Sequence, residues 1–139
     1  MSDSSEVDAA LSAKLLNDAT LMAIMTDGVY FDEAAQGKTK FVIVSLIAEF
    51  DEPMFNARAF EDATYLVKAV AKSSSGADVK TAAARIDTLL EQGTMTITGY
   101  GLMAMRRIER VRYTEVDDQD PSIRWQHRGG RYQVVAGTP

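Results

Sequence analysis

Four pairs of neighbouring carboxylates are the first residues in this chain that could do acid–base chemistry. All four fall in predicted turns or at predicted strand ends, where acids are normally solvated, and none stands at a spacing from a histidine or a further acid that would build one site. The pairs are Asp32-Glu33, Asp51-Glu52, Glu61-Asp62 and Asp117-Asp118. They therefore predict surface charge and no catalytic dyad.

The single histidine, His127, lies beside Trp125 and among Arg124, Arg128 and Arg131. No residues nearby have the spacing of metal ligands, so we expect a strand residue whose ring stacks or hydrogen-bonds locally. The chain has no cysteine, which excludes disulfides and thiolate catalysis. Neither glycine-rich phosphate-binding pattern is present. The sequence thus predicts no enzyme, no metal site and no cofactor.

Arginines dominate the C-terminal part of the chain. Residues 106–139 contain seven bases and five acids, whereas residues 1–60 contain four bases and ten acids. All seven bases are arginines, and pairing the two strands predicted here gathers their guanidinium groups on a small area. They are Arg106, Arg107, Arg110, Arg112, Arg124, Arg128 and Arg131.

Three interpretations of these arginines stay open. They pair with the acidic half of the same subunit, with that half of a neighbouring subunit, or with nucleic-acid phosphates. The net charge of −5 argues against the third, because proteins that depend on phosphate contacts are usually basic overall. A molecule with one acidic and one basic end suits head-to-tail association, which closes into rings.

The elements that position these residues are organised around residues 59–97, which predict strand, helix, strand. Residues 65–71 alternate with the period of a strand, and the next segment has the period of a helix. Ser74 or Ser75 is the expected N-cap of this helix, and Gly93 its left-handed C-cap. Its apolar stripe is predicted to be Val79, Ala83, Ile86 and Leu90, widened by Leu89.

Before this unit, we expect a helix over residues 6–17, a short turn capped by Asp18 over 19–25, an extended piece over 29–31 and a central strand over 41–50 that Asp51-Glu52-Pro53 ends. After it, we expect a short strand over 94–98, a loop over 99–103, a strand over 106–116 with a bulge near Glu109-Arg110, and a last strand from Ile123 that is interrupted at Gly129-Gly130. These elements predict one α+β domain over residues 1–139: a mainly antiparallel sheet of five or six strands with two helices packed on one face.

Two loops carry apolar residues that the predicted elements leave uncovered. Met54 and Phe55 lie at the tip of the first, where they either fold back on the sheet edge or contact a subunit. Tyr100, Leu102 and Met103 belong to the second. Together with the arginines, these five residues are the candidates for subunit or partner contacts.

The order and spacing of the elements resemble the tail-completion, or tail-terminator, family of long-tailed bacteriophages and gene transfer agents. The likeness covers nearly the whole chain. One departure is Phe41, which follows Lys40 directly where relatives often carry a proline. The passages that carry the likeness are VDAALSAKLLND, VYFDEAAQGKTKFVIVSL, ATYLVKAVAKS, DVKTAAARIDTLLE and RIERVRYTEVDDQDPSIRWQHRGGRYQVV.

The resemblance implies a structural protein of the virion. Such proteins form a ring, typically of six subunits, at the head-proximal end of the tail tube, where they stop tube growth and join the tube protein to the head connector. It implies assembly in the host cytoplasm, and DNA that passes through the ring without specific binding. Acids that would suit such a lumen or an acidic surface are Asp51, Glu52, Asp117, Asp118 and Asp120.

Two other functions remain as alternatives. One is a head-side neck or connector component of the same virion. The other is a small nucleic-acid-binding module that uses the arginine strands, with Trp125, Tyr113 and Tyr132 as stacking residues. No membrane role is expected, because no run of 18 apolar residues occurs and the N-terminus is acidic and polar.

Overall fold

The computed structural model describes residues 5–54, 57–73 and 75–137, and of residues 5, 49–54 and 57–61 it describes the backbone alone. Phe55 and the side chains of Met54, Asp51 and Glu52 therefore lie outside the described part. The elements are α1 (Ser5–Leu16), α2 (Ala19–Ile24), β1 (Val29–Phe31), β2 (Lys40–Met54), β3 (Ala57–Lys72), α3 (Ala77–Leu90), β4 (Gly101–Val116) and β5 (Arg124–Gly137).

The strands form one five-stranded sheet in the order β1-β2-β3-β5-β4. All neighbours are antiparallel except β1, which runs parallel to β2. The predicted α+β class and the mainly antiparallel sheet are therefore confirmed. The sheet centre, however, is β3 and not the strand that begins near Phe41, because β5 pairs with β3 along its whole length.

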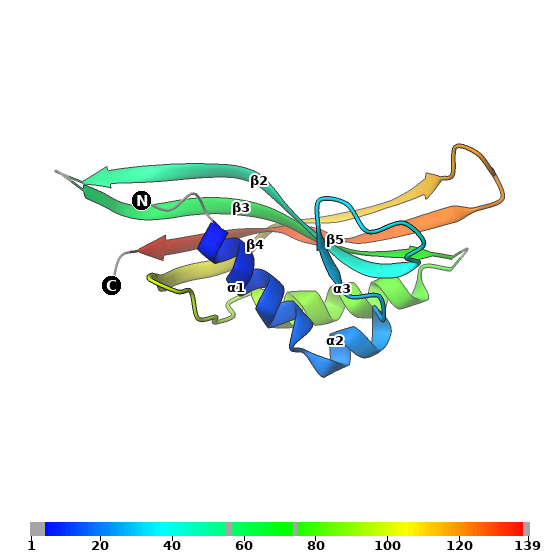
Figure 1. Ribbon diagram of the computed structural model, residues 1–139, viewed down its shortest axis with the longest axis horizontal. Helices are drawn as coiled ribbons and strands as arrows, with labels where there is room; N and C mark the ends of the chain where they lie inside the picture. Colours follow the sequence, from blue (N-terminus) through cyan, green and yellow to red (C-terminus); the bar gives the residue numbers. More distant parts are fainter. Residues whose placement is uncertain (1–4, 55–56, 74, 138–139) are drawn as a thin grey trace.

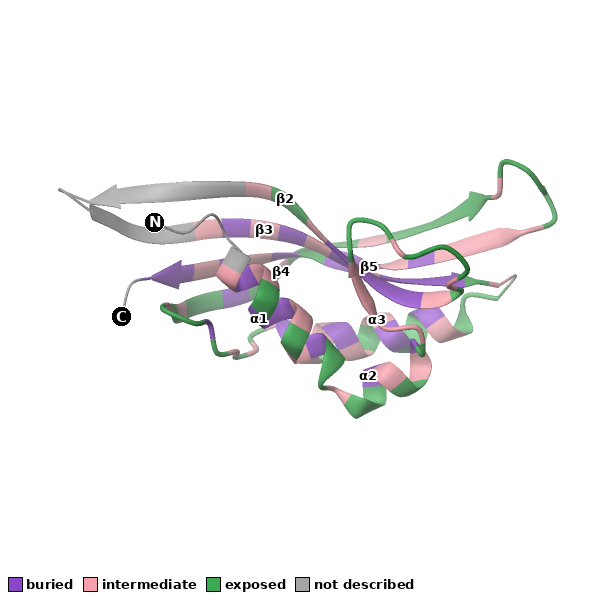
Figure 2. Cartoon of the chain, in the orientation of Figure 1, coloured by how far each residue is buried: buried purple, intermediate pink, exposed green. Residues whose placement is uncertain are grey.

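The three helices lie on one side of the sheet, and the long strands extend beyond them in both directions (Figure 1). The face of α3 that packs on the sheet carries Val79, Ala82, Ile86 and Leu90, all at most 3% exposed. Ala82 takes the place predicted for Ala83, which is only partly buried. Buried residues gather where α3 and α1 meet the central strands (Figure 2).

An ion pair joins the start of α2 to α3. Asp18 is the N-cap of α2, as predicted, and accepts a hydrogen bond from the Leu21 amide at 2.9 Å. The same carboxylate receives two bonds from the Arg85 guanidinium, at 2.6 and 2.8 Å. This bidentate contact, with the Leu21 amide, holds the pKa of Asp18 below its ordinary value. It fixes the N-terminal helices against the helix that covers the sheet.

The first hairpin is longer than the sequence predicted. β2 continues through Asp51, Glu52 and Pro53, and pairing with β3 reaches Met54 and Ala57. Pro53 is tolerated because β1 pairs only with Val42 to Val44, so this part of β2 has no described strand on its other side to which an amide would donate. The predicted end of the strand at Asp51-Glu52-Pro53 is therefore wrong.

The chain between α3 and β4 also differs from the prediction. Residues 94–98 form no strand, and Ile97 makes a single bridge to Tyr100 in a turn. β4 begins at Gly101, inside the predicted loop, and its pairing with β5 has two register shifts. One falls between Leu102 and Ala104, and the other between Arg107 and Glu109, slightly before the predicted bulge. The left-handed residue after α3 is Gln92, with φ of 56°, in place of Gly93. Gly93 serves a close approach instead, since a Cβ there would lie 2.0 Å from the Leu89 carbonyl oxygen.

The last strand runs through its two glycines without a break. β5 pairs with β3 on one side and β4 on the other at both Gly129 and Gly130. A Cβ on Gly129 would lie 2.1 Å from the Val67 carbonyl oxygen and 2.5 Å from the Lys68 Cα. The glycine therefore lets β5 approach β3 where any side chain would separate the two strands.

We expect Gly129→Ala to lower the free energy of unfolding by about 1–3 kcal/mol, because the added methyl group meets backbone atoms that cannot move aside cheaply. Urea denaturation measures this difference. Gly101→Ala is the matched control, since a Cβ there meets nothing within 4 Å. Equal stability of the two variants would contradict the close approach of β5 to β3.

Candidate assembly interface

The face of the sheet that points away from the helices carries a second, smaller apolar cluster. Phe41, Ile43 and Val70 are buried there, at 7%, 5% and 2% exposure, and Trp125 packs against them. The rings of Phe41 and Trp125 lie 6.2 Å apart between centroids. The strand register explains the position of the cluster, since Phe41 pairs with Val70 and Val70 pairs with His127 on successive strands. No described helix covers this face.

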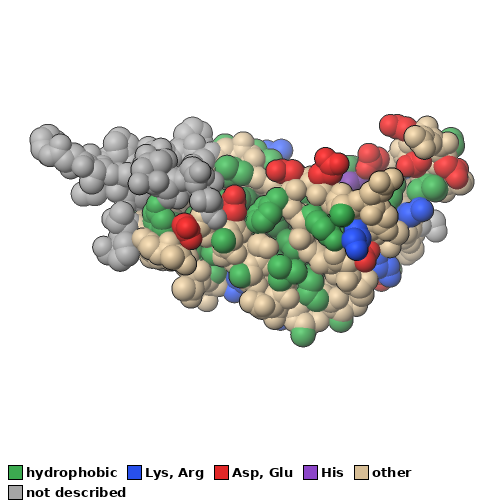
Figure 3. Space-filling model, viewed as in Figure 1, with side chains coloured by type: hydrophobic (Ala, Val, Ile, Leu, Met, Phe, Trp, Pro, Cys, Tyr) green, Lys and Arg blue, Asp and Glu red, His purple; other side chains and the backbone are tan. Residues whose placement is uncertain are grey.

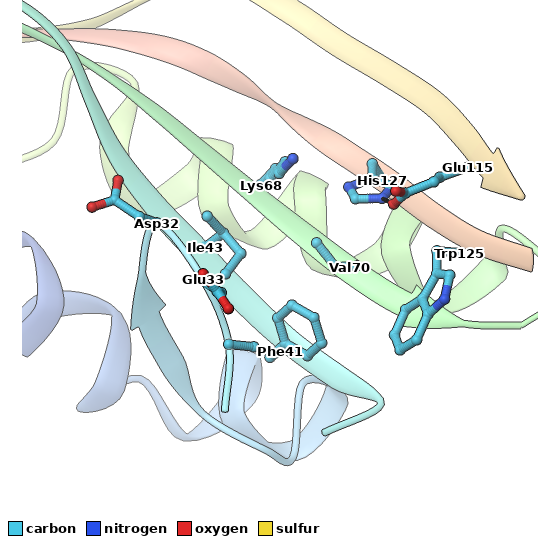
Figure 4. Close-up of a pocket in the computed structure, with 10 residues that line it drawn as sticks. Asp32, Glu33, Phe41, Ile43, Lys68, Val70, Glu115, Trp125 and His127 are labelled. Carbon is cyan, nitrogen blue, oxygen red and sulfur yellow. Dashed lines mark hydrogen bonds and ion pairs between the residues drawn. The ribbon is translucent and has the colours of Figure 1, made fainter. Parts of the chain in front are cut away.

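A hollow of ≈ 330 Å³ opens over this cluster. Its floor is apolar, and the carboxylates of Asp32 and Glu33 stand on one side of it and that of Glu115 on the other (Figure 4). The remaining lining residues are Ala34, Lys68 and His127. We call this feature the acidic hollow. Figure 3 shows Asp and Glu side chains in a row along the sheet side of the molecule, opposite the helices.

His127 lies at one wall of the acidic hollow and is 7% exposed. Its ring stacks on Tyr113, with centroids 4.3 Å apart and planes at 11°, and its Nε2 lies 3.0 Å from a Glu115 oxygen. The predicted local stacking and hydrogen bonding are confirmed. Burial lowers the pKa of His127 below the ordinary 6.5, and the positive charge of Lys68 lowers it further, against the effect of Glu115. Nδ1 has no hydrogen-bond partner among the described residues.

Four of the seven arginines are engaged inside the subunit. Arg107 donates to both oxygens of Asp87 in α3 at 2.7 Å, and Arg131 pairs with Glu109 at 2.7 Å. The other two make hydrogen bonds, Arg106 to Gln133 and Arg124 to the Pro121 carbonyl. Of the described acids, the partners of these arginines thus come from α3 and β4 and not from the N-terminal half.

Asp87 is the centre of a hydrogen-bond network at the edge of the core. Besides Arg107, it accepts a hydrogen bond at 2.9 Å from the hydroxyl of Tyr132, which is 1% exposed. Burial and the neighbouring carboxylate raise the pKa of Tyr132 well above its ordinary value, so the hydroxyl keeps its proton and donates. The network ties α3 to β4 and β5.

The other three arginines, Arg110, Arg112 and Arg128, line a shallow hollow of ≈ 240 Å³ with Ala83 of α3. We call them the arginine cluster. Among the described residues, none of the three has an ion pair or hydrogen-bonded acid. Arg112 pairs with Arg128 in register, so two like charges stand side by side across the strands. Uncompensated charge of this kind is what a partner with carboxylates would neutralise.

The structure places the remaining predicted residues in three different settings. Tyr100 and Leu102 pack partly on the main core, whereas Met103 is 61% exposed. Asp117 and Asp120 build the turn between β4 and β5: Asp117 accepts from the Gln119 and Asp120 amides, and Asp120 accepts from the Ser122 amide and hydroxyl, which lower the pKa of Asp120. Asp118 is exposed beside them.

Sequence reasoning missed the acidic hollow. Its floor combines Phe41 from β2, Val70 from β3 and Trp125 from β5, which are far apart in the chain and meet only through the register. One signal was present: a nearly continuous apolar run begins at Phe41, such runs are typical of strands covered on both faces, and Phe41 to Val44 are all buried.

The described part of the chain shows neither a metal site nor a membrane-spanning helix. No three side chains of His, Asp, Glu or Cys within that part lie together as metal ligands would. None of its helices has the length and apolar character to cross a bilayer.

Solved structures show the same fold in other proteins. The chain aligns with a chain of the "virion of native gene transfer agent (GTA) particle" at a TM-score of 0.68 and 18% identity, over 94% of this chain and 95% of that one. A second solved structure aligns at a TM-score of 0.56 and 15% identity over 96% of both chains. No protein-family model matches the chain, and no curated protein matches it.

The Asp87 network generates one prediction. We expect Asp87→Ala to lower the free energy of unfolding by about 1–3 kcal/mol, because it leaves the buried Tyr132 hydroxyl and Arg107 without an acceptor. Tyr132→Phe removes that orphaned hydroxyl. The double variant should therefore be less destabilised than the sum of the single variants in a double-mutant cycle, and strict additivity would contradict the network.

His127 generates a second prediction, on pH. Its folded-state pKa lies below its unfolded value, so the unfolded state takes up a proton first as pH falls. Stability is then complete above the ordinary value of 6.5 and declines below it. We expect unfolding free energies from urea titrations to fall between about pH 7.5 and about pH 5 in the natural protein.

His127→Phe keeps the ring on Tyr113 and cannot titrate, so its stability should be nearly flat over the same range. Asp18, Asp27 and Asp120 do not complicate this window, since their pKa values lie below the ordinary 3.8 and contribute only in stronger acid. An equal slope in both proteins would show that His127 is not the titrating group.

Proposed function

We propose that this chain is a structural protein of a phage or gene transfer agent virion, and specifically a tail terminator. In this role it forms a ring, of six subunits in the simplest case, at the head-proximal end of the tail tube. The ring stops growth of the tube and joins the tube protein to the head connector. It assembles in the host cytoplasm and stays in the virion.

The observation that carries the proposal is the alignment with a chain of a gene transfer agent virion over nearly the full length of both chains. The alignment alone supports the class. The tail-terminator role rests in addition on the sequence resemblance to the tail-completion family, in the order of helices and strands and in the arginine-rich ending.

The charge distribution is compatible with a ring around DNA. The chain has a net charge of −5, and an acidic wall would let a phosphate backbone slide without being held. Which acids would face the DNA stays a prediction. Asp117 and Asp120 already shape the β4–β5 turn through hydrogen bonds, whereas Asp118 is exposed and makes no such hydrogen bond among the described residues.

Deleting the gene and imaging the particles by electron microscopy tests this function. We expect tails of unregulated length and heads without tails, both restored by supplying the natural protein in trans. Tails of normal length that fail to join heads would favour the neck role instead. Particles with normal, joined tails would contradict a structural role in the virion.

A further inference from the structure

The acidic hollow and the arginine cluster lie on opposite faces of the sheet. Arg128 pairs with Ala69, which belongs to the main core, so the arginine cluster is on the helix side. His127 pairs with Val70 of the small apolar cluster, so the acidic hollow is on the other side. The strands β4 and β5 thus carry the arginine cluster on one face of the sheet, and on the other face they form one side of the acidic hollow.

The chemistry of the acidic hollow fits a guanidinium group. Its lining includes the aromatic rings of Phe41 and Trp125, and a planar guanidinium packs favourably on aromatic rings. Three carboxylates stand around it, whereas Lys68 is its one cation and is already hydrogen-bonded to the Tyr113 hydroxyl at 2.5 Å. An apolar floor with an acidic rim binds an arginine through both its plane and its charge.

We propose that the acidic hollow of one copy receives the arginine cluster of a second copy of this chain. The inference rests on the proposed ring and names the contact that would build it. Each surface supplies what the other lacks. Around its apolar floor the hollow has the carboxylates of Asp32 and Glu33, which pair with no cation in the described part of the chain, and that of Glu115, which contacts His127. The cluster has three guanidinium groups with no acid partner among the described residues. Because the two surfaces are on opposite faces, the contact is head-to-tail and leaves each copy free to bind another.

A second copy fits better than nucleic acid. Phosphates would be repelled by the acids that the same molecule carries around the acidic hollow, and the net charge of −5 opposes an approach at long range. A second copy instead carries a surface of opposite charge for either of the two surfaces. Nucleic acid at the arginine cluster is therefore an alternative outcome of the experiment and not part of the proposal.

Three variants test the contact by sedimentation equilibrium at protein concentrations up to about 1 mM, where even a weak contact is populated. Arg110→Glu with Arg112→Glu disables the arginine cluster. Glu33→Lys with Asp32→Asn disables the acidic hollow, and asparagine is chosen because position 32 has a φ of 62°, which it tolerates. Arg106→Glu is the matched control, since it reverses an exposed charge on the opposite face of the same strand.

We expect the natural protein and Arg106→Glu to form species larger than dimers, and each double variant to associate at least about tenfold more weakly. An equimolar mixture of the two double variants should form dimers and nothing larger, because one intact cluster and one intact hollow remain. Thermal unfolding followed by circular dichroism verifies that every variant is folded.

Several outcomes would overturn the contact: a natural protein that stays monomeric throughout, double variants that associate like the natural one, or a mixture of folded variants that stays monomeric. Loss of low-salt DNA binding in the Arg110→Glu, Arg112→Glu variant, with self-association intact, would show that the arginine cluster binds phosphate.

The deletion phenotype separates the proposed contact from the proposed function. If deletion of the gene causes a tail defect but the variants show no such contact, the proposed function holds and the contact is wrong. If the variants confirm the contact but deletion causes no tail defect, the contact holds and the proposed function is wrong.

Discussion

The structure depends on the fact that the helices cover only one face of a sheet longer than they are. α3 lays one apolar stripe across β3 and β5, and its edges are fixed by two carboxylates, Asp18 to Arg85 and Asp87 to Arg107. In the described part of the chain, no helix packs on the opposite face of the sheet. Its apolar residues are therefore buried only by their neighbours and by the loop near Ala34. This imbalance makes the uncovered face the natural place for another protein.

Charge follows the same division. Where α3 meets the edge of the sheet, arginine finds an acid within the subunit, and the pair contributes to holding helix and strands together. Further along β4, α3 presents Ala83 to the strands in place of an acid, and Arg110 and Arg112 stand beside Arg128 without an acid partner among the described residues. Placing like charges across neighbouring strands costs stability. A partner that supplies carboxylates to the arginine cluster would offset this cost, so binding there would be favourable.

Local patterns predicted the parts of this fold that local physics determines. The alternation from Tyr65 to Ala71 and the Asp18 cap follow from residue periods and cap chemistry, and both are present. The stripe of α3 is present with Ala82 in place of Ala83, and the N-cap of that helix is Gly76, not Ser74 or Ser75. The errors concern partners. The prediction that Pro53 ends a strand assumed that a neighbouring strand lies on each side of it. Residues 94–98 have the alternation of a strand, but no strand pairs with them. The acidic hollow could not be foreseen, since it exists only after three distant strands take their register. The arginines were noticed, but which of them find a partner depends on the residue that α3 places beside each one: Asp87 lies at Arg107, and Ala83 lies at the arginine cluster.

The central claim is that the uncovered face of the sheet is closed by assembly. Trp125, the single tryptophan of the chain, lies on this face and reports on it directly. Acrylamide quenching of its fluorescence, measured on the isolated subunit and on assembled particles or rings, is the most direct test. The account predicts that assembly protects the indole and lowers the quenching constant several-fold. Equal quenching in the free and assembled states would show that this face stays open, and would contradict the account.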